Sequence, residues 1–382
     1  MVAALGRRAG DQLTVHVGPE ESPRPVTFRS PVASEDGDLL LPLALLPAMV
    51  RGDRLRVAEP LSPQLLDAVP AITDVATTFD RYAWGLDLRP VLVEAPARVP
   101  DAPSGGRGLA CFFSGGVDST FTVRAHRKDL TALVFVHGFD VPLDDAPLRH
   151  AVSTTLRAAA EALGLPLIEV EADLHRFAHG LVPWSAYHGS AMATVAHLLA
   201  PLADTFLVPA SDTYATLSAY GSHPLLDPLW SSESVSILHD GCVASRVDKV
   251  RSFGEDDGGP DPLSWLRVCW RNPGGAYNCG RCPKCVSTMV ALRMAGLLER
   301  APTFPSTLDL ARVAALDLSS PGSGLLWSRY VRDLDASGTD PALARAIRVA
   351  LATRRAHPVW RSLKRAAAGS PTRSLAADRR MR

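Results

Sequence analysis

The sequence predicts an α/β protein in which helices cover both faces of a parallel sheet, and three observations support this class. Of the 382 residues, 47% are hydrophobic, so the chain can bury a large core. From residue 108 onward, short apolar runs alternate with stretches of helical period. The apolar runs are continuous, which is typical of strands buried on both faces of a parallel sheet.

Strands and helices are expected to alternate through the central part of the chain. The expected strands are GLACFF (108–113), ALVFVHGF (132–139), LPLIEVEADL (165–174) and TFLVPASDTY (205–214). The expected helices cover 118–127, 146–165 and 184–203. This order implies βαβ units and a doubly wound sheet. Ligands of such sheets bind beyond the carboxyl ends of the strands, so the strand ends are the first places to look for a site.

The chain is expected to have four regions. Residues 1–95 contain short strand-like runs separated by Pro and Gly, which predicts a small β-rich N-terminal domain. Residues 96–107 are rich in Pro, Gly and Ala and are expected to be a linker. The α/β domain is assigned to 108–298. A helical region with a basic tail follows at 299–382; we expect the tail to be solvated, and contact with RNA phosphates is the alternative.

Charge and hydropathy exclude some partners. Lys plus Arg and Asp plus Glu both number 40, so no global field recruits nucleic acid or an anionic membrane. No run of 18 apolar residues occurs, and the first residues lack the apolar core of a secretory signal. We therefore expect a cytoplasmic protein with no membrane partner, and nucleic acid is not a favoured partner.

The stretch LACFFSGGVDSTF (109–121) is the strongest candidate site. Gly115 and Gly116 allow a sharp turn after a buried strand. The turn and the following helix start present unsatisfied N–H groups, which suits a pyrophosphate. Hydroxyl donors are available from Ser114, Ser119 and Thr120. The spacing is neither a Walker A loop nor a dinucleotide fingerprint. The alternative is an ordinary strand–turn–helix connection capped by Asp118 or Ser119.

This S-G-G-V-D-S segment resembles the PP-loop of the N-type ATP pyrophosphatases. The resemblance implies an adenine nucleotide α-hydrolase-like fold, Mg²⁺, and cleavage of ATP to AMP and pyrophosphate. It also implies adenylation of a carboxyl or amide oxygen, which ammonia or sulfur then displaces. The resemblance assigns the pyrophosphate to Ser114, Gly115, Gly116, Asp118 and Ser119, and the adenine to the neighbourhood of Val136 and His137. Asp118 is also expected to be catalytic.

Four of the six cysteines cluster in CWRNPGGAYNCGRCPKC. The spacing is C-x9-C-x2-C-x2-C, through Cys269, Cys279, Cys282 and Cys285. Four thiolates at this spacing suit tetrahedral Zn²⁺ in a structural site. Arg281 and Lys284 lie among them and are expected to offset their charge. An iron–sulfur cluster and a redox C-x-x-C pair are the alternatives. Cys111 and Cys242 are expected to be isolated buried thiols.

The two motifs together resemble the 7-cyano-7-deazaguanine synthase family over about residues 108–295. Members of that family carry a structural zinc, are often dimers, and convert a carboxylate to an amide and then a nitrile with ammonia and ATP. Lys249 in SRVDKVRSF matches a family lysine, which implies contact with phosphate or adenylate. A solvated lysine on a helix is the alternative. The family's deazapurine-binding segment is not recognisable, so we expect a different or larger acceptor, either a small molecule or a macromolecule.

Residues at the expected strand ends are candidates for contact with the acceptor. Ser211, Asp212 and Tyr214 follow the fourth strand, and Asp212 is the candidate catalytic residue among them. Asp140 follows the second strand, where it can bind ribose or metal. His188 lies near a helix start, with a packed or capping role as the alternative. Further candidates for the same cleft, which turns in a Pro-rich segment explain nearly as well, are Asp227, Glu233, His239 and Asp240.

The leading functional hypothesis is an ATP-dependent, AMP-forming ligase that installs nitrogen on a carboxyl or amide group, with ATP, Mg²⁺ and Zn²⁺ as cofactors. Its partners are an acceptor and ammonia or another nitrogen donor. The first alternative is a PP-loop sulfurtransferase acting on tRNA or a small molecule. The second is a nucleotide-binding partner protein in a defence or biosynthetic system.

Overall fold

The computed structural model describes residues 1–99, 106–318 and 321–353. Contacts within the chain divide it into two compact units, Met1–Thr307 and Leu308–Arg382. The first unit contains the sheet and every motif discussed above, so it is described in most detail. The basic tail at 354–382 and the central part of the expected linker lie outside the described residues.

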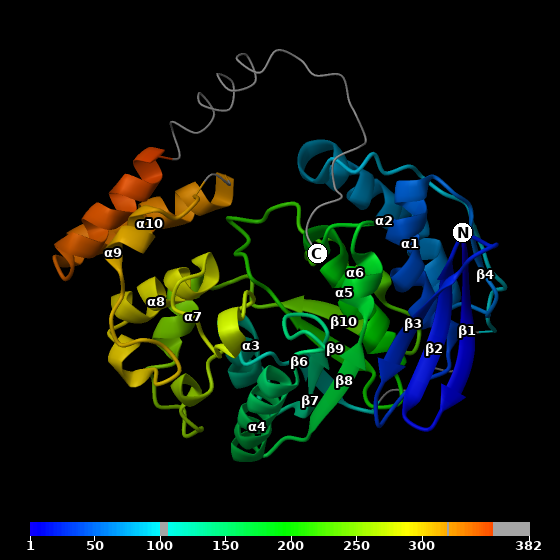
Figure 1. Ribbon diagram of the computed structural model, residues 1–382, viewed down its shortest axis with the longest axis horizontal. Helices are drawn as coiled ribbons and strands as arrows, with labels where there is room; N and C mark the ends of the chain where they lie inside the picture. The colour runs from blue at the N-terminus through cyan, green and yellow to red at the C-terminus, as the bar shows by residue number, and fades with distance from the viewer. Residues whose placement is uncertain (100–105, 319–320, 354–382) are drawn as a thin grey trace, which may run out of the picture. The chain divides into compact units, whose positions relative to one another are not determined.

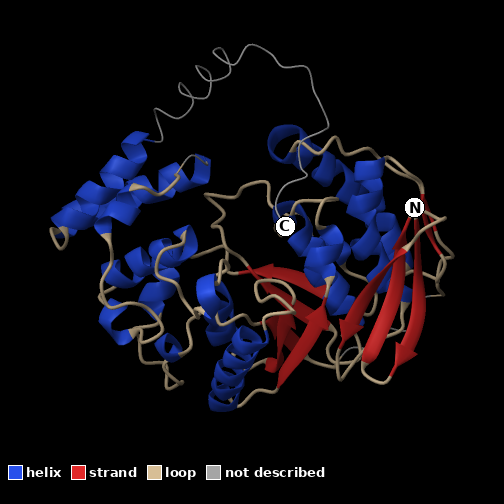
Figure 2. Cartoon of the chain, viewed as in Figure 1, coloured by secondary structure: helices blue, strands red, loops and turns tan. Residues whose placement is uncertain are grey.

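A large, mostly parallel sheet forms the centre of the first unit (Figures 1 and 2). Its parallel core contains β6 (Leu109–Phe112), β7 (Leu130–His137), β8 (Leu167–Ala172), β9 (Thr205–Pro209) and β10 (Ser236–Asp240), in the spatial order β10-β9-β6-β7-β8. The expected α/β class and the four expected strands are confirmed. β10 was not expected. It is an edge strand whose Ser236 and Leu238 are exposed, so its sequence lacks a continuous apolar run.

Residues 1–95 were expected to form a separate domain, but their strands extend the same sheet. The antiparallel strands are β1 (Val2–Ala9), β2 (Gln12–Gly18) and β3 (Arg24–Arg29). Two short strands, β4 (Leu55–Val57) and β5 (Val93–Glu94), continue beyond β1. β3 pairs antiparallel with β8, where Phe28 lies opposite Ala172. This pairing covers what is otherwise an exposed edge of the parallel core.

Helices cover both faces of the sheet, which is compatible with a doubly wound fold. One face packs against α1 (Leu40–Arg51), α2 (Pro63–Phe79), α5 (Leu174–Ala178) and α6 (Trp184–Leu198). The other packs against α3 (Val117–His126) and α4 (Ala146–Leu163), which ends at Gly164 as expected. Successive strand residues point to opposite faces, so Val134 joins the first core and Leu133 the second.

Helix α1 shows how burial overrides local propensity. Its sequence contains Pro42 near the start and Pro47 inside the helix, and no helix was expected there. Every residue from Leu40 to Met49 is buried, so packing stabilises the helix despite the prolines. In the part of the chain that the structure describes, no helix combines the length and apolar character that crossing a bilayer requires.

The remaining helices follow the central sheet in sequence. α7 (Arg246–Ser252) and α8 (Pro283–Met294) belong to the first unit, and α9 (Leu310–Ala314) and α10 (Pro321–Ser337) belong to the second. Residues 341–353 are also helical, so the described part of the C-terminal region is helical as expected. Short helical turns are η1 (Gly37–Leu39), η2 (Asp80–Trp84), η3 (Asp227–Trp230), η4 (Pro262–Ser264), η5 (Pro273–Gly275) and η6 (Leu298–Arg300).

A close approach between α6 and the segment at 221–222 fixes the wall of the candidate site. A Cβ atom on Gly189 falls 2.0 Å from the carbonyl oxygen of Gly221. We expect Gly189→Ala to lower the free energy of unfolding by about 1–3 kcal/mol, because backbone atoms must shift to relieve the overlap. Urea unfolding followed by circular dichroism measures the loss.

Gly254→Ala is the matched control for this substitution. Its Cβ meets Leu297 Cδ2 at 3.2 Å, and that side chain can rotate away. The control is therefore expected to cost less. Equal losses for the two variants contradict the role given to the α6 contact.

Candidate functional site

A cavity of about 200 Å³ lies at the carboxyl ends of β6 and β9. β6 and β9 are neighbours in the sheet. The chain continues from β6 to β7 on one side and from β9 to β10 on the other, so the strand order reverses between β6 and β9. Such a reversal in strand order leaves a crevice, and it is the usual ligand-binding position of an open α/β sheet. The SGGVDS loop after β6 and the Ser211–Asp212 segment after β9 form two of its walls.

The SGGVDS loop has the backbone geometry of an anion cradle. Gly115 has φ +69°, a conformation that other residues rarely adopt, and a Cβ there falls 2.8 Å from Leu156 Cδ2. Gly116 is the N-cap of α3 and provides no side-chain cap, so the first-turn N–H groups remain available to a ligand. The N–H of Arg267 donates to the Gly115 carbonyl at 2.8 Å and so holds the turn.

The hydroxyl groups of the loop divide between the cavity and the core. Ser114 and Ser119 line the cavity, with their Oγ atoms 3.4 Å apart. Thr120 was expected beside them, but it is buried and does not line the cavity. Its Oγ1 instead accepts a hydrogen bond from Trp265 Nε1 at 3.4 Å. Successive side chains on a helix differ in direction by about 100°, so Thr120, which follows Ser119, points into the core and not into the cavity.

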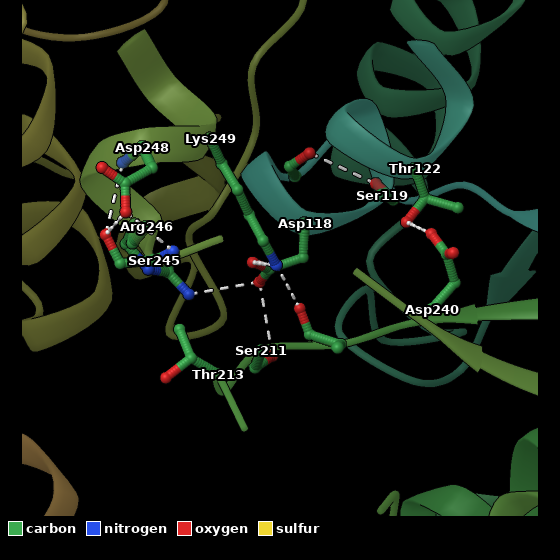
Figure 3. A network of polar contacts seen from close by, with 12 residues as sticks. Asp118, Ser119, Thr122, Ser211, Thr213, Asp240, Ser245, Arg246, Asp248 and Lys249 are labelled. Atoms are coloured by element: carbon green, nitrogen blue, oxygen red, sulfur yellow. Dashed lines mark hydrogen bonds and ion pairs between the residues drawn. The ribbon is translucent and has the colours of Figure 1, made fainter. Parts of the chain in front are cut away.

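Asp118 is the centre of a charged network (Figure 3). Lys249 Nζ lies 3.1 Å from Oδ1, and Arg246 Nη2 lies 3.2 Å from Oδ2. Ser211 Oγ donates to Oδ2 at 3.3 Å. Burial raises the pKa of Asp118, but the charges of Arg246 and Lys249 outweigh it and hold the pKa below its usual range. Asp118 is therefore a paired carboxylate.

Lys249 is buried, so the solvated-lysine alternative is wrong. Its side chain is 1% exposed, and Nζ also donates to the carbonyl of Ala210 at 2.5 Å, at the end of β9. The helix that carries it, α7, begins with a capping box between Ser245 and Asp248. Lys249 is not part of the cavity lining and contacts Asp118 from outside the cavity.

Two cations of the site were not assigned to it from the sequence. Arg246 lies one helical turn before Lys249, on the same face of α7, and that spacing is a signal that was missed. Lys284 was expected to offset the charge of the cysteine cluster. It instead lines the cavity from the first turn of α8. In the sequence, a lysine in the first helical turn after a capping cysteine is only a weak indication that the lysine belongs to a ligand site.

The expected adenine residues lie on opposite faces of β7. Val136 lines the cavity with Phe112, Val134 and Phe135. His137 does not line it, although Phe135, two residues earlier on the same face of β7, does. Its Nε2 lies 2.8 Å from Glu169 Oε2 instead. Burial raises the pKa of Glu169, but hydrogen bonds from His137, Ser153 and Arg157 outweigh this effect and lower the pKa to about 2.

Most of the expected acceptor residues lie together. Ser211, Asp212, Asp140 and His188 all line the cavity. Ser218 donates to Asp212 Oδ2 at 2.9 Å. Burial lowers the pKa of His188, whose Nδ1 lies 3.2 Å from the Trp184 carbonyl.

Tyr214 does not join this group. Its side chain is 64% exposed and is not part of the lining, although its N–H donates to the Cys242 carbonyl at 3.0 Å. The four further candidates also divide. His239 lines the cavity and contacts Asp227. Glu233 binds the N–H of Gln64, and Asp240 binds Thr122 and His126, so neither lines the cavity.

Aromatic side chains form a further part of the cavity lining, which we call the aromatic end. Phe139 and Trp184 meet edge to face with ring centroids 4.9 Å apart. The rings of His188 and Tyr220 lie 4.5 Å apart. All four line the cavity. Apart from His188, sequence reasoning missed them, because they come from separate segments and share no motif.

The four clustered cysteines form a group that can hold a metal ion such as zinc. Their Sγ atoms all lie within 4.8 Å of one another, and those of Cys279 and Cys285 are 3.9 Å apart. Tetrahedral Zn–S bonds of about 2.3 Å place the sulfurs about 3.8 Å apart, so the group fits a single ion. Burial raises the pKa of Cys279, but hydrogen bonds led by the N–H groups of Arg281 and Cys282 lower it to about 7.

The other two cysteines do not belong to this group. Cys111 and Cys242 are both buried, as expected, and burial raises the pKa of each. A buried thiol with a raised pKa is a poor metal ligand and a poor nucleophile.

The cysteine group is joined to the cavity at two points. Cys269 follows Arg267 by two residues, and the N–H of Arg267 holds the Gly115 turn. Cys282 caps α8 by accepting the Cys285 N–H at 3.4 Å, and α8 carries Lys284 into the cavity. A metal that fixes the thiolates therefore also fixes one backbone bond of the loop and one cation of the cavity.

Comparison with protein-family models, with curated proteins and with solved structures finds no match to this chain.

Stripping a metal from the cysteine group is expected to loosen the SGGVDS loop. The Arg267 amide is the donor to Gly115, so its exchange with deuterium should accelerate when a chelator strips the thiolates. Hydrogen-exchange mass spectrometry of the peptides that contain Gly115 and Arg267 measures the change. A peptide from the buried α1 is the control. Faster exchange in α1 alone, or in neither region, contradicts the coupling.

Proposed function

We propose that the chain is an ATP-dependent ligase that forms AMP and pyrophosphate and installs nitrogen on a carboxyl or amide group. One observation carries the proposal: the SGGVDS loop presents its helix start into the cavity at the strand-order reversal, beside the buried Asp118–Lys249 pair. The helix start, the hydroxyls of Ser114 and Ser119, and Lys284 all line one cavity, and this combination suits a polyphosphate.

The phosphates of ATP are assigned to the loop end of the cavity. The N–H groups of the first α3 turn and the hydroxyls of Ser114 and Ser119 donate to phosphate oxygens. Lys284, which lines the same cavity, supplies a point charge. Mg²⁺ is assigned to the same end, where it neutralises charge as pyrophosphate leaves.

The adenine is assigned to the apolar pocket beside the loop. Phe112, Val134 and Val136 line this part of the cavity, and a flat aromatic base fits an apolar wall of this kind. The acceptor then lies at the aromatic end, near Asp212 and His188.

In the proposed chemistry, adenylation converts the acceptor oxygen from a poor leaving group into part of a good one, AMP. An acceptor oxygen attacks the α-phosphorus, and pyrophosphate leaves with the bonding electron pair. The nitrogen nucleophile then attacks the activated carbon, and AMP leaves with the oxygen. The reaction needs positioning and charge neutralisation more than covalent catalysis by the protein.

The buried state of Cys111 supports nitrogen over sulfur transfer. Cys111 is the cysteine nearest to the SGGVDS loop in sequence, and a persulfide carrier must be an accessible thiolate. Cys111 is fully buried and its pKa is raised well above the usual value, so it is unsuited to that role.

We assign zinc to the cysteine group as a structural metal. Four thiolates around one ion leave no open coordination position for chemistry. In an iron–sulfur cluster the thiolates bind different irons and lie farther apart than around one ion. Sulfurs within 4.8 Å of one another favour the single ion.

ATP turnover and binding test the ligase. The purified chain should release AMP and pyrophosphate from Mg²⁺ and ATP when it is given ammonium chloride and a filtered small-molecule extract as the source of acceptor. Lys284→Met should weaken the binding of ATP with Mg²⁺ about 10–100-fold, because it removes a charge-assisted bond to phosphate.

Lys128→Met is the matched control, because Lys128 is exposed at the other end of α3 from the loop. Calorimetry with ATP and Mg²⁺ measures both affinities. Equal affinity in the two variants, or release of ADP in place of AMP, rules the proposal out.

Elemental analysis tests the metal assignment. The protein should contain one zinc per chain, and Cys282→Ser should lose it, because removing one of four ligands opens the site. Iron and inorganic sulfide with a visible absorption band overturn the zinc assignment. They do not by themselves affect the assignment of ATP to the cavity.

A further inference from the structure

A histidine–aspartate pair lies at the acceptor end of the cavity. His239 is the fourth residue of β10 and lines the cavity. Its Nδ1 lies 2.7 Å from Oδ2 of Asp227, which belongs to the short helix η3. The two side chains are 5% and 1% exposed. Because the pair is buried and its histidine ring lines the cavity, it is a candidate for proton transfer to or from a ligand.

Asp227 is itself held in place by two further donors. Ser222 Oγ donates to Oδ2 at 2.7 Å, and the N–H of His223 donates to Oδ1 at 3.3 Å. An ionised carboxylate only accepts hydrogen bonds, so the neutral His239 ring must carry its proton on Nδ1. The lone pair then lies on Nε2. Among the described residues, Nε2 of His239 has no hydrogen-bond partner.

The position of Ser222 distinguishes this arrangement from a nucleophilic triad. A triad serine lies at the ring nitrogen opposite the aspartate, where the histidine removes its proton. Ser222 Oγ instead lies on the Asp227 side, 3.4 Å from Nδ1. The free ring nitrogen therefore serves a group that enters the cavity from outside.

We propose that His239 is the base that takes a proton from the nitrogen nucleophile, with Asp227 as its positioning residue. This inference rests on the proposed ligase function. Ammonia and simple amines are protonated near neutral pH and have no free electron pair in that form. A nearby base that removes one proton produces the reactive species inside the cavity.

The charges around the pair favour a cationic nucleophile. Asp212 and Asp140 line the same cavity, and their carboxylates attract an ammonium ion. Asp227 of η3 contacts His239, and His223 interacts with it electrostatically. Asp212 of the loop after β9 and His188 of α6 line the same cavity.

The proton and electron balance of the step is complete. Nε2 takes a proton from ammonium, and the nitrogen electron pair of ammonia attacks the carbonyl carbon of the adenylated acceptor. The bond from that carbon to the AMP oxygen breaks, and AMP leaves with the electron pair. The nitrogen releases its extra proton to solvent, and the His239 imidazolium, paired with Asp227, returns its own proton to solvent.

Rapid-quench kinetics separate the two half-reactions. The reaction contains ATP, Mg²⁺, ammonium chloride and the filtered small-molecule extract. We expect His239→Gln to keep the first burst of pyrophosphate and the affinity for ATP, but to release AMP about 100-fold more slowly or worse. The AMP rate of H239Q should recover as the pH rises, because free ammonia then replaces the missing base.

His126→Gln is the matched control. His126 Nε2 lies 3.0 Å from Asp240 Oδ1, so this variant also breaks a histidine–aspartate pair, but one outside the cavity. It should behave as the wild type. An AMP rate in H239Q equal to that of the control overturns the inference, as does loss of the pyrophosphate burst. A wild type that gives no pyrophosphate overturns the ligase function, and this inference with it.

Nitrogen NMR of histidine-labelled protein provides a readout that does not depend on turnover. Neutral His239 should show a protonated Nδ1 and an unprotonated Nε2, and Asp227→Asn should shift the ring toward the other tautomer. D227N should also slow AMP release with the pyrophosphate burst intact. A wild-type ring protonated on Nε2 in its neutral form contradicts the proposal.

Discussion

The buried ion pair between Asp118 and Lys249 is the interaction on which the candidate site depends. The two residues are 131 positions apart in the chain, and Lys249 also binds the Ala210 carbonyl. The pair thus joins the start of α3, the helix α7 and the end of β9. Taking either charge out of water costs several kcal/mol, and losing one partner leaves the other buried and unpaired, at about 3–5 kcal/mol. The geometry of the SGGVDS loop is therefore stable only when α7 packs against α3.

The same pair sets the electrostatic character of the loop. A lone carboxylate at the start of α3 repels phosphate, although it also stabilises the helix N-terminus. Arg246 and Lys249 together more than neutralise Asp118, so the group is cationic as a whole. Lys284, which lines the same cavity, adds a further positive charge. Asp118 is thus compatible with anion binding by the SGGVDS loop once its cationic partners are included.

The sequence predicted the elements whose signal is local. β6, β7 and β9 are largely buried and read as continuous apolar runs, and α4 ends at the glycine that marks it. β8 is half-buried and carries Glu169 and Glu171 among its apolar residues. β10 was missed because an exposed edge strand has no such run. The burial of Thr120 follows from the side-chain periodicity of a helix, which could have been applied to each motif residue separately. The position of His137 does not follow from strand alternation, because Phe135 on the same face of β7 lines the cavity. Lys284 and the aromatic end depend on tertiary packing, which no local pattern encodes.

The two ends of the cavity differ in how they are built, and this difference bears on function. The end proposed for phosphate is built mainly from the contiguous SGGVDS motif, with Lys284 from α8, and Arg267 holds the motif next to the four clustered cysteines. The acceptor end is assembled from β7, α6, β10 and the loops after β9, with Phe139, Trp184 and His239 from three of these segments or their ends. A substitution in any of these segments alters the proposed acceptor pocket without changing the SGGVDS loop proposed to hold the phosphates. In such an arrangement the proposed activation chemistry stays fixed while the choice of acceptor is free to vary. The aromatic end of the cavity and the Asp227–His239 pair are therefore the features that should determine which acceptor binds.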